Sequence, residues 1–149
     1  MNIKYVHTNI VSSNWKELAD FYTIVFGCKE VLPQRKLSGD WLSQGTGVAN
    51  AAFEGVHLRL PGYGEAGPTL EIYQYTHMLD KAEAAPNRKG YGHLAFLVDD
   101  VEKMLQKLIA YGGKALGSIC KHTVEGVGML TFVYATDPEG NILELQHWN

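Results

Sequence analysis

The amino-acid sequence predicts an α+β fold made of two copies of one βαβββ module. Strand-like and helix-like patterns of apolar residues follow one another in the same order in both halves of the chain. Each half also starts with a strand that carries a histidine, His7 or His93, and ends with a strand that carries a glutamate, Glu71 or Glu144. The copies lie much farther apart than the repeats of solenoid proteins, so we expect a duplicated module and not an array.

The first module covers residues 1–75 and contains one clear helix. Ser13 or Asn14 can cap this helix, and Glu17 lies three residues after Asn14, which is typical of a capping box. Apolar residues then recur at helical spacing as far as Gly27, which favours a helix end. The segment Trp41–Thr46 is ambiguous. The strands of this module are expected at Lys4–Val11, Cys28–Leu37, Val48–Leu60 and Thr69–Tyr75.

The second module, residues 90–149, follows a linker over residues 76–89 that lacks periodicity and contains a proline. Asp99 or Asp100 can cap its helix. Cys120–Gly128 is expected to be a polar loop. The strands are expected at Tyr91–Val98, Lys114–Ile119, Met129–Thr136 and Asn141–Trp148. We expect the two modules to make up a single domain over residues 1–149, because each alone has too small a core.

The composition restricts the location and the partners of the protein. No apolar run approaches the roughly 20 residues that span a bilayer, and the N-terminus has no signal-peptide pattern. We therefore expect a cytoplasmic protein that does not associate with a membrane. The net charge is −3 and the charges are mixed along the chain, which argues against a nucleic-acid partner. Cys28 and Cys120 are in no metal-type spacing and are expected to be free thiols.

The candidate functional residues are two histidines and two glutamates on equivalent strands: His7, Glu71, His93 and Glu144. A single glutamate between apolar neighbours usually points to solvent, because successive side chains of a strand alternate between its faces. Here, however, the face of Glu71 also carries Tyr73 and Tyr75, and that of His93 carries Tyr91, which is unlike an ordinary solvent face. Two imidazoles and two carboxylates suit a divalent ion of Ni, Zn, Co, Mn or Fe. We therefore expect the four residues to form one metal site.

Several short motifs resemble the vicinal oxygen chelate superfamily, which includes glyoxalase I, methylmalonyl-CoA epimerase, extradiol dioxygenases and bleomycin-resistance proteins. The motifs extend over nearly the whole chain and are Val6-His7-Thr8, Asp20-Phe21-Tyr22 with Phe26-Gly27, Leu70-Glu71, Gly90-Tyr91-Gly92-His93 and Asp137-Pro138-Glu139-Gly140-Asn141-Ile142-Leu143-Glu144-Leu145. The resemblance implies that the two modules form a cup-shaped, open β-barrel with the helices outside. The order of the four ligands is similar to that of bacterial, nickel-type glyoxalase I, whereas the epimerases usually have glutamine where Glu71 stands.

This resemblance implies a metal-dependent lyase or isomerase similar to glyoxalase I, the lactoylglutathione lyase. A substrate with neighbouring oxygens would chelate the ion, which acts as a Lewis acid and stabilises an enediolate. Glu144 or Glu71 would move the proton. Two alternatives stay open. One is an extradiol dioxygenase with Fe(II) held by His7, His93 and Glu144, and the other is a non-catalytic small-molecule-binding protein of the resistance type, which normally lacks the metal ligands. We also expect a homodimer, and the linker over residues 76–89 is long enough for the two modules to pair either within one chain or across the dimer.

The substrate side of the site departs from glyoxalase I. That enzyme holds glutathione with basic and amide side chains at positions where this chain has Val11 and Tyr75, and its lysine-and-glycine stretch is replaced by Cys120-Lys121-His122-Thr123. The use of glutathione is therefore open. His57 and Arg59 share a strand face, where Arg59 could hold a carboxylate or phosphate, although an ordinary exposed pair is equally consistent. The candidate substrate-binding residues are Tyr73, Tyr91, Arg59, His57 and Tyr134.

Overall fold

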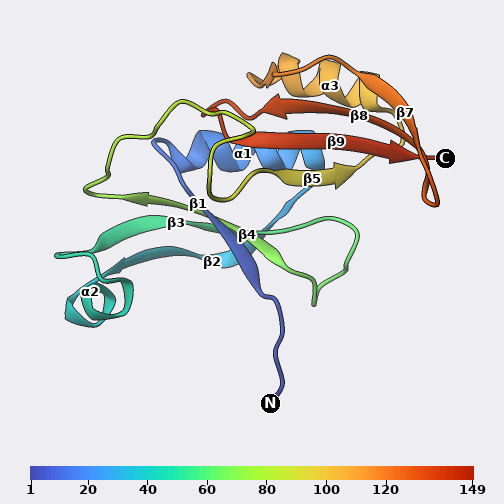
Figure 1. Ribbon diagram of the computed structural model, residues 1–149. Coiled ribbons are helices and arrows are strands. Elements are labelled where there is room, and N and C mark those ends of the chain that lie inside the picture. Colours follow the sequence, from blue (N-terminus) through green and yellow to red (C-terminus); the bar gives the residue numbers. More distant parts are fainter. The chain divides into compact units, whose positions relative to one another are not determined.

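The computed structural model describes all 149 residues, which form two compact units, residues 1–80 and 81–149. Unit 1 contains a four-stranded sheet in the order β1-β4-β3-β2, in which β1 and β4 run parallel and the other neighbours antiparallel (Figure 1). Its elements in chain order are β1 (His7–Val11), α1 (Trp15–Phe26), β2 (Lys29–Ser38), α2 (Asp40–Thr46), β3 (Ala52–Arg59) and β4 (Thr69–Tyr75).

Unit 2 repeats this arrangement with a five-stranded sheet. The order is β5-β9-β8-β6, with β5 parallel to β9, and β7 pairs with the other end of β8. The short strands β6 and β7 together therefore take the place that β2 has in unit 1. The elements are β5 (Leu94–Leu97), α3 (Val101–Ala110), β6 (Lys114–Ala115), β7 (Cys120–Val124), β8 (Gly128–Thr136) and β9 (Ile142–Trp148). The predicted α+β class with two βαβββ repeats is confirmed.

The core of unit 1 determines which side chains of the sheet are free to form a polar site. Helix α1 packs on β3 and β4 and buries an apolar face. The strand residues on this face are Val56, Leu58, Leu70 and Ile72, each at most 1% exposed. Because side chains alternate along a strand, the residues between them, which include His57 and Glu71, must lie on the opposite face.

Two segments differ from the sequence-based expectation. The predicted loop at Cys120–Gly128 was wrong, because Cys120–Val124 form β7 and pair antiparallel with β8. This strand is exposed along most of its length, so its backbone pairs without the apolar pattern that would have identified it. The ambiguous segment Trp41–Thr46 lies in α2, whose Leu42 packs beside Phe53 in a small apolar cluster. None of the helices is long and apolar enough to cross a membrane.

The turn before β9 is organised by a buried carboxylate, that of Asp137, which is 1% exposed. Its Oδ1 accepts hydrogen bonds from the backbone N–H groups of Glu139 and Asn141, both at 2.9 Å, and its Oδ2 accepts one from Nδ2 of Asn141 at 2.7 Å. Lys81 donates from Nζ to the carbonyl of Glu139 at 3.1 Å and to Oδ1 of Asn141 at 2.6 Å. The motif Asp137–Asn141 is thus explained by the turn that delivers the chain into β9 and to Glu144.

Replacing this carboxylate should destabilise the protein more than replacing an exposed helix cap. Asp137→Ala leaves three donors without their acceptor and should lower the free energy of unfolding by about 3 kcal/mol. Asp100→Ala is the matched control, because Asp100 is an exposed helix cap whose partners are the backbone N–H of Lys103 and, 3.3 Å away, the exposed Nζ of the same residue. Urea denaturation of both variants measures the difference, and an equal loss in the two would contradict this role for Asp137.

Candidate functional site

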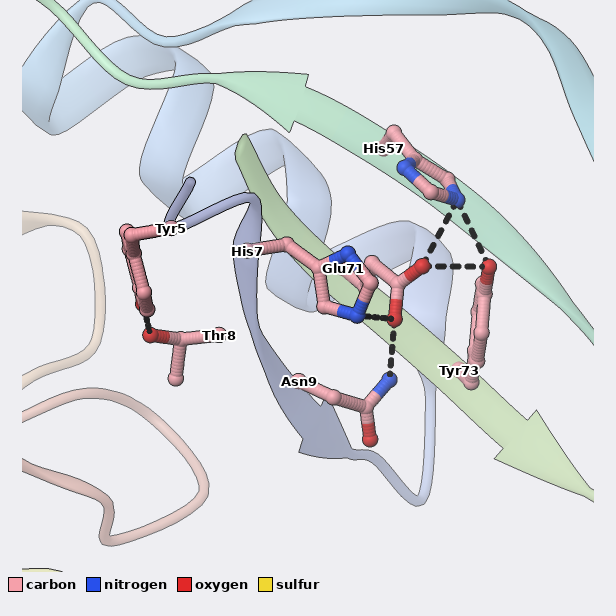
Figure 2. A network of polar contacts seen from close by, with 7 residues as sticks. All are labelled: Tyr5, His7, Thr8, Asn9, His57, Glu71 and Tyr73. Carbon is pink, nitrogen blue, oxygen red and sulfur yellow. Dashed lines mark hydrogen bonds and ion pairs between the residues drawn. The ribbon is translucent and has the colours of Figure 1, made fainter. Parts of the chain in front are cut away.

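Glu71 is the centre of a polar network in unit 1. It lies in the middle of β4, where it pairs with Asn9 of β1 on one side and His57 of β3 on the other. The glutamate is only 7% exposed, although it carries an ionisable group. Figure 2 shows that side chains from all three strands point toward its carboxylate. The carboxylate is therefore buried among donors instead of facing solvent.

The two oxygens of Glu71 have separate sets of partners. Oε2 lies 3.2 Å from Nε2 of His7 and accepts a hydrogen bond from Nδ2 of Asn9 at 3.3 Å. Oε1 lies 2.9 Å from Nε2 of His57 and accepts a hydrogen bond from the Tyr73 hydroxyl at 3.0 Å. His57 Nε2 and the Tyr73 hydroxyl are themselves 2.6 Å apart. Each oxygen is therefore in contact with two side chains, as Figure 2 shows.

The surroundings of Glu71 shift the pKa values of two of its partners. Burial of the imidazole lowers the pKa of His57 by more than the Glu71 carboxylate raises it, and the nearby cations Arg35 and Arg59 add to the lowering. The pKa of Tyr73 is raised, mainly because the hydroxyl is buried and to a smaller extent because it donates a hydrogen bond to Glu71. At neutral pH, His57 is therefore a neutral imidazole and Tyr73 a protonated phenol that donates to the carboxylate.

Unit 2 contains a second pair of the same residue types. Nε2 of His93 lies 2.8 Å from Oε2 of Glu144, with side-chain exposures of 29% and 15%. The ring of Tyr134 packs against that of His93, with centroids 4.7 Å apart, and Tyr134 pairs with Glu144 across β8 and β9. His93 comes directly before β5 and not inside it, because β5 begins at Leu94.

The two histidine–glutamate pairs occupy equivalent positions in the two sheets. In unit 1 the strand partner of Glu71 is Asn9, two residues after His7. In unit 2 the strand partner of Glu144 is Ala95, two residues after His93. On the other side of the glutamates, His57 in unit 1 corresponds to Tyr134 in unit 2.

Each pair has a spacing that suits two ligands of one divalent ion. Ligand atoms about 2.1 Å from an ion and at right angles to each other lie roughly 3 Å apart, and the two N–O separations here are 3.2 and 2.8 Å. Imidazole and carboxylate are also the donors that Zn, Ni, Co and Fe accept. No group of three or more histidine, cysteine, aspartate or glutamate side chains is arranged to hold an ion by itself. In unit 1, His7 contacts Oε2 of Glu71 and His57 contacts Oε1, and the two imidazole rings have centroids 6.0 Å apart.

The predicted substrate-binding residues have different environments. Tyr73 is 8% exposed, and its hydroxyl is engaged by Glu71 and His57, whereas Tyr91 is fully exposed. Arg59 donates from Nη1 to the carbonyl of Gly67, and its buried Nε has no hydrogen-bond partner. Sequence reasoning treated His57 and Tyr73 as substrate contacts and gave Asn9 no role. The strand pairing that brings them to Glu71 was not visible in the sequence.

Two sheets of βαβββ topology, each with a histidine–glutamate pair in the same register, define a duplicated α+β module. The model of the Glyoxalase/Bleomycin resistance protein/Dioxygenase superfamily matches residues 4–145. The chain therefore belongs to this superfamily. No curated protein matches the chain.

Solved structures of the same fold agree with this assignment. A glyoxalase family protein from Bacillus cereus is 18% identical, with a TM-score of 0.77, over 99% of this chain and 94% of that one. A superfamily protein from Alicyclobacillus acidocaldarius is 14% identical, with a TM-score of 0.55, over 97% and 91% of the two chains. A glyoxalase I variant from Zea mays is 23% identical, with a TM-score of 0.64, over 96% of this chain but 44% of the maize chain. At these identities the likeness establishes the fold alone.

The pKa of His57 tests the electrostatics of the network. In the metal-free protein we expect His57 to titrate below the ordinary histidine pKa of about 6.5. Glu71→Gln should lower this pKa further, because it removes the negative charge that favours the imidazolium. NMR titration of the histidine rings measures both values.

His147 is the internal control for this titration. Its Nδ1 lies 2.8 Å from the carbonyl of Val98, and this contact, together with Asn149, raises the pKa of His147. The pKa of His147 should therefore exceed the ordinary value and should not respond to Glu71→Gln. A His57 pKa at or above that of His147 would contradict the burial of the network.

Proposed function

We propose that this protein is a metal-dependent lyase or isomerase that acts on small molecules and is similar to glyoxalase I. The observation that supports the proposal is the histidine–glutamate pair that recurs in the same strand register in both units. A pair kept at equivalent positions of a duplicated module, with a spacing that suits adjacent ligands, is difficult to explain by packing alone. The superfamily and one solved structure of similar fold, from a glyoxalase I, are consistent with this class of reaction.

The residues that would hold the ion are the two imidazoles and two carboxylates of the pairs: His7, Glu71, His93 and Glu144. With a divalent cation bound, the site would have no net charge, because the two carboxylates balance the charge of the ion. A bound divalent ion would supply Lewis-acid polarisation of a substrate that carries neighbouring oxygens. The protein must then supply the group that moves the proton.

Glu144 is the carboxylate that we assign to proton transfer. Four side chains contact the oxygens of Glu71, whereas Glu144 has one such contact, with His93. A carboxylate held by one neighbour can turn toward a substrate carbon, take its proton, and return the same proton to the adjacent carbon. Glu71 would have to leave four partners to do the same.

A second candidate function follows from the same asymmetry. If the donors around Glu71 keep it from the ion, His7, His93 and Glu144 are left as two histidines and one carboxylate, a set that suits Fe(II) oxygen chemistry. The extradiol dioxygenase is therefore the alternative enzyme. The third possibility, a binding protein without catalysis, predicts ligand affinity without any need for metal.

Metal analysis and paired assays separate these functions. The tag-free protein, purified without chelators, should contain a divalent metal, and His93→Ala should weaken metal binding by at least tenfold. Metal-free protein reloaded with Ni(II) or Co(II) should isomerise α-keto hemithioacetals made with several thiols, and catechol ring cleavage should be absent. Ring cleavage that appears only with Fe(II) and is retained in the Glu71→Ala variant would overturn the proposal of a lyase and favour the extradiol dioxygenase. Neither activity, together with tight aromatic-ligand binding to metal-free protein, would favour the binding protein.

The catalytic carboxylate has its own test. Glu144→Gln should lower kcat about 10²- to 10⁴-fold, which is the usual contribution of general acid–base catalysis. Glu54→Gln is the matched control, because Glu54 is an exposed glutamate on β3, next to Gly55 and on the face opposite His57. Equal kcat values for the two variants would contradict the role of Glu144.

We also propose that the protein is a homodimer, and light scattering measures its molar mass in solution.

A further inference from the structure

One oxygen of Glu71, Oε1, is contacted by two side chains from outside the histidine–glutamate pair, His57 and Tyr73. Nε2 of His57 lies 2.9 Å from Oε1. The Tyr73 hydroxyl donates to the same oxygen at 3.0 Å. Because the hydroxyl hydrogen of Tyr73 goes to Oε1, the tyrosine oxygen accepts a hydrogen bond from Nε2 of His57 at 2.6 Å, and all three groups fix one another (Figure 2).

This inference rests on the proposed function. We propose that His57 and Tyr73 are positioning residues that hold Oε1 of Glu71 and leave Oε2, beside His7, as the single oxygen with which the glutamate ligates the ion. Oε2 lies 3.2 Å from Nε2 of His7, the spacing of two adjacent ligands, and its other contact, with Nδ2 of Asn9, is the longest of the four around this carboxylate at 3.3 Å. Ligating carboxylates in metal sites are commonly held by such outer hydrogen bonds.

The Tyr73 ring is itself fixed by the apolar part of the sheet. It stacks on Phe53 with centroids 4.2 Å apart and an interplanar angle of 17°. Gly55 lies opposite Tyr73 in the strand pairing, and a Cβ at Gly55 would come within 1.9 Å of the carbonyl oxygen of Ile72 and within 2.7 Å of the tyrosine ring. Only glycine therefore fits beside β4 at this position and leaves the Tyr73 ring where its hydroxyl reaches Glu71.

Unit 2 lacks this arrangement. Tyr134 stands where His57 stands in unit 1, and it packs on the ring of His93 instead of binding the carboxylate. Gln146 stands where Tyr73 stands, two residues after the glutamate, and its Oε1 accepts a bond from Nε1 of Trp148 at 2.9 Å. The contacts of His57 and Tyr73 are thus specific to Glu71 and are not repeated around Glu144.

A purely structural role for the two donors predicts different results from a positioning role. Donors that merely satisfy a buried carboxylate would, when removed, lower stability without a specific effect on metal binding. Positioning residues should change both the affinity for an ion and the coordination of that ion. The readouts are therefore the Co(II) dissociation constant from calorimetry, the visible absorption spectrum of the Co(II) protein, and the thermal midpoint of the metal-free protein.

The variants are chosen to remove single donors. Tyr73→Phe removes one hydroxyl and keeps the stacked ring. Tyr75→Phe is its matched control, because Tyr75 also packs on Phe53, with centroids 5.1 Å apart, but does not bond to Glu71. His57→Leu removes the imidazole donor, and His57→Gln is the rescue variant, because the glutamine amide can donate from nearly the position of Nε2.

We expect Tyr73→Phe and His57→Leu to weaken Co(II) binding about 10- to 100-fold and to change the Co(II) spectrum. His57→Gln should recover most of the affinity, and Tyr75→Phe should leave affinity and spectrum unchanged. Lower thermal midpoints with unchanged affinity and spectrum would overturn the positioning role and leave the proposed function standing. No Co(II) binding by the wild-type protein would overturn the proposed function and this inference with it.

Discussion

The burial of the Glu71 carboxylate is the constraint on which the candidate site depends. An ionised group in an apolar sheet is unfavourable unless partners replace the water that it loses. The sheet of unit 1 supplies them by topology. β4 is the one strand of this sheet that has the parallel strand β1 on one side and the antiparallel strand β3 on the other. A glutamate at its centre can therefore receive His7 and Asn9 from one neighbour and His57 from the other.

Duplication of the module explains why the site residues come in pairs and why the pairs are not identical. The backbone register of the glutamates is the same in both units. Their other neighbours differ, because Asn9 and His57 of unit 1 correspond to Ala95 and Tyr134 of unit 2. A shared backbone thus places two carboxylates in equivalent positions. A few side-chain differences surround Glu71 with four contacting side chains and Glu144 with one.

The sequence predicted the parts of this structure that depend on local pattern. Helix α1 begins after Asn14, whose side chain accepts a bond from the backbone N–H of Glu17 at 3.3 Å, and ends at Gly27 in the left-handed conformation, as the capping residues indicated. The central strands were recognisable because one face is apolar. β7 was missed because an exposed strand needs only backbone partners and carries no apolar signal.

The contacts of the candidate site were harder to predict. Strand alternation placed Glu71 and Tyr73 on one face, and this depended on sequence alone. The partners of the glutamate depend on which residues stand opposite it, and the pairing of His57 with Glu71 is set by the loop between β3 and β4 and by the register that it fixes. One residue of slip would have turned His57 away from the glutamate. The role of His57 therefore becomes apparent only when the register is known.

Tyr73 connects the packing of unit 1 to its chemistry. Its ring belongs to the apolar cluster that includes Leu42 and Phe53, and its hydroxyl belongs to the network of Glu71. A hydroxyl on an exposed, freely rotating side chain would lose conformational entropy on binding the carboxylate, whereas this ring has already been immobilised by stacking. The room for it comes from Gly55, a residue with no side chain and no chemistry of its own. The precision of a polar site on this sheet is therefore a consequence of its apolar packing, and a residue that never contacts the carboxylate can determine where the carboxylate points.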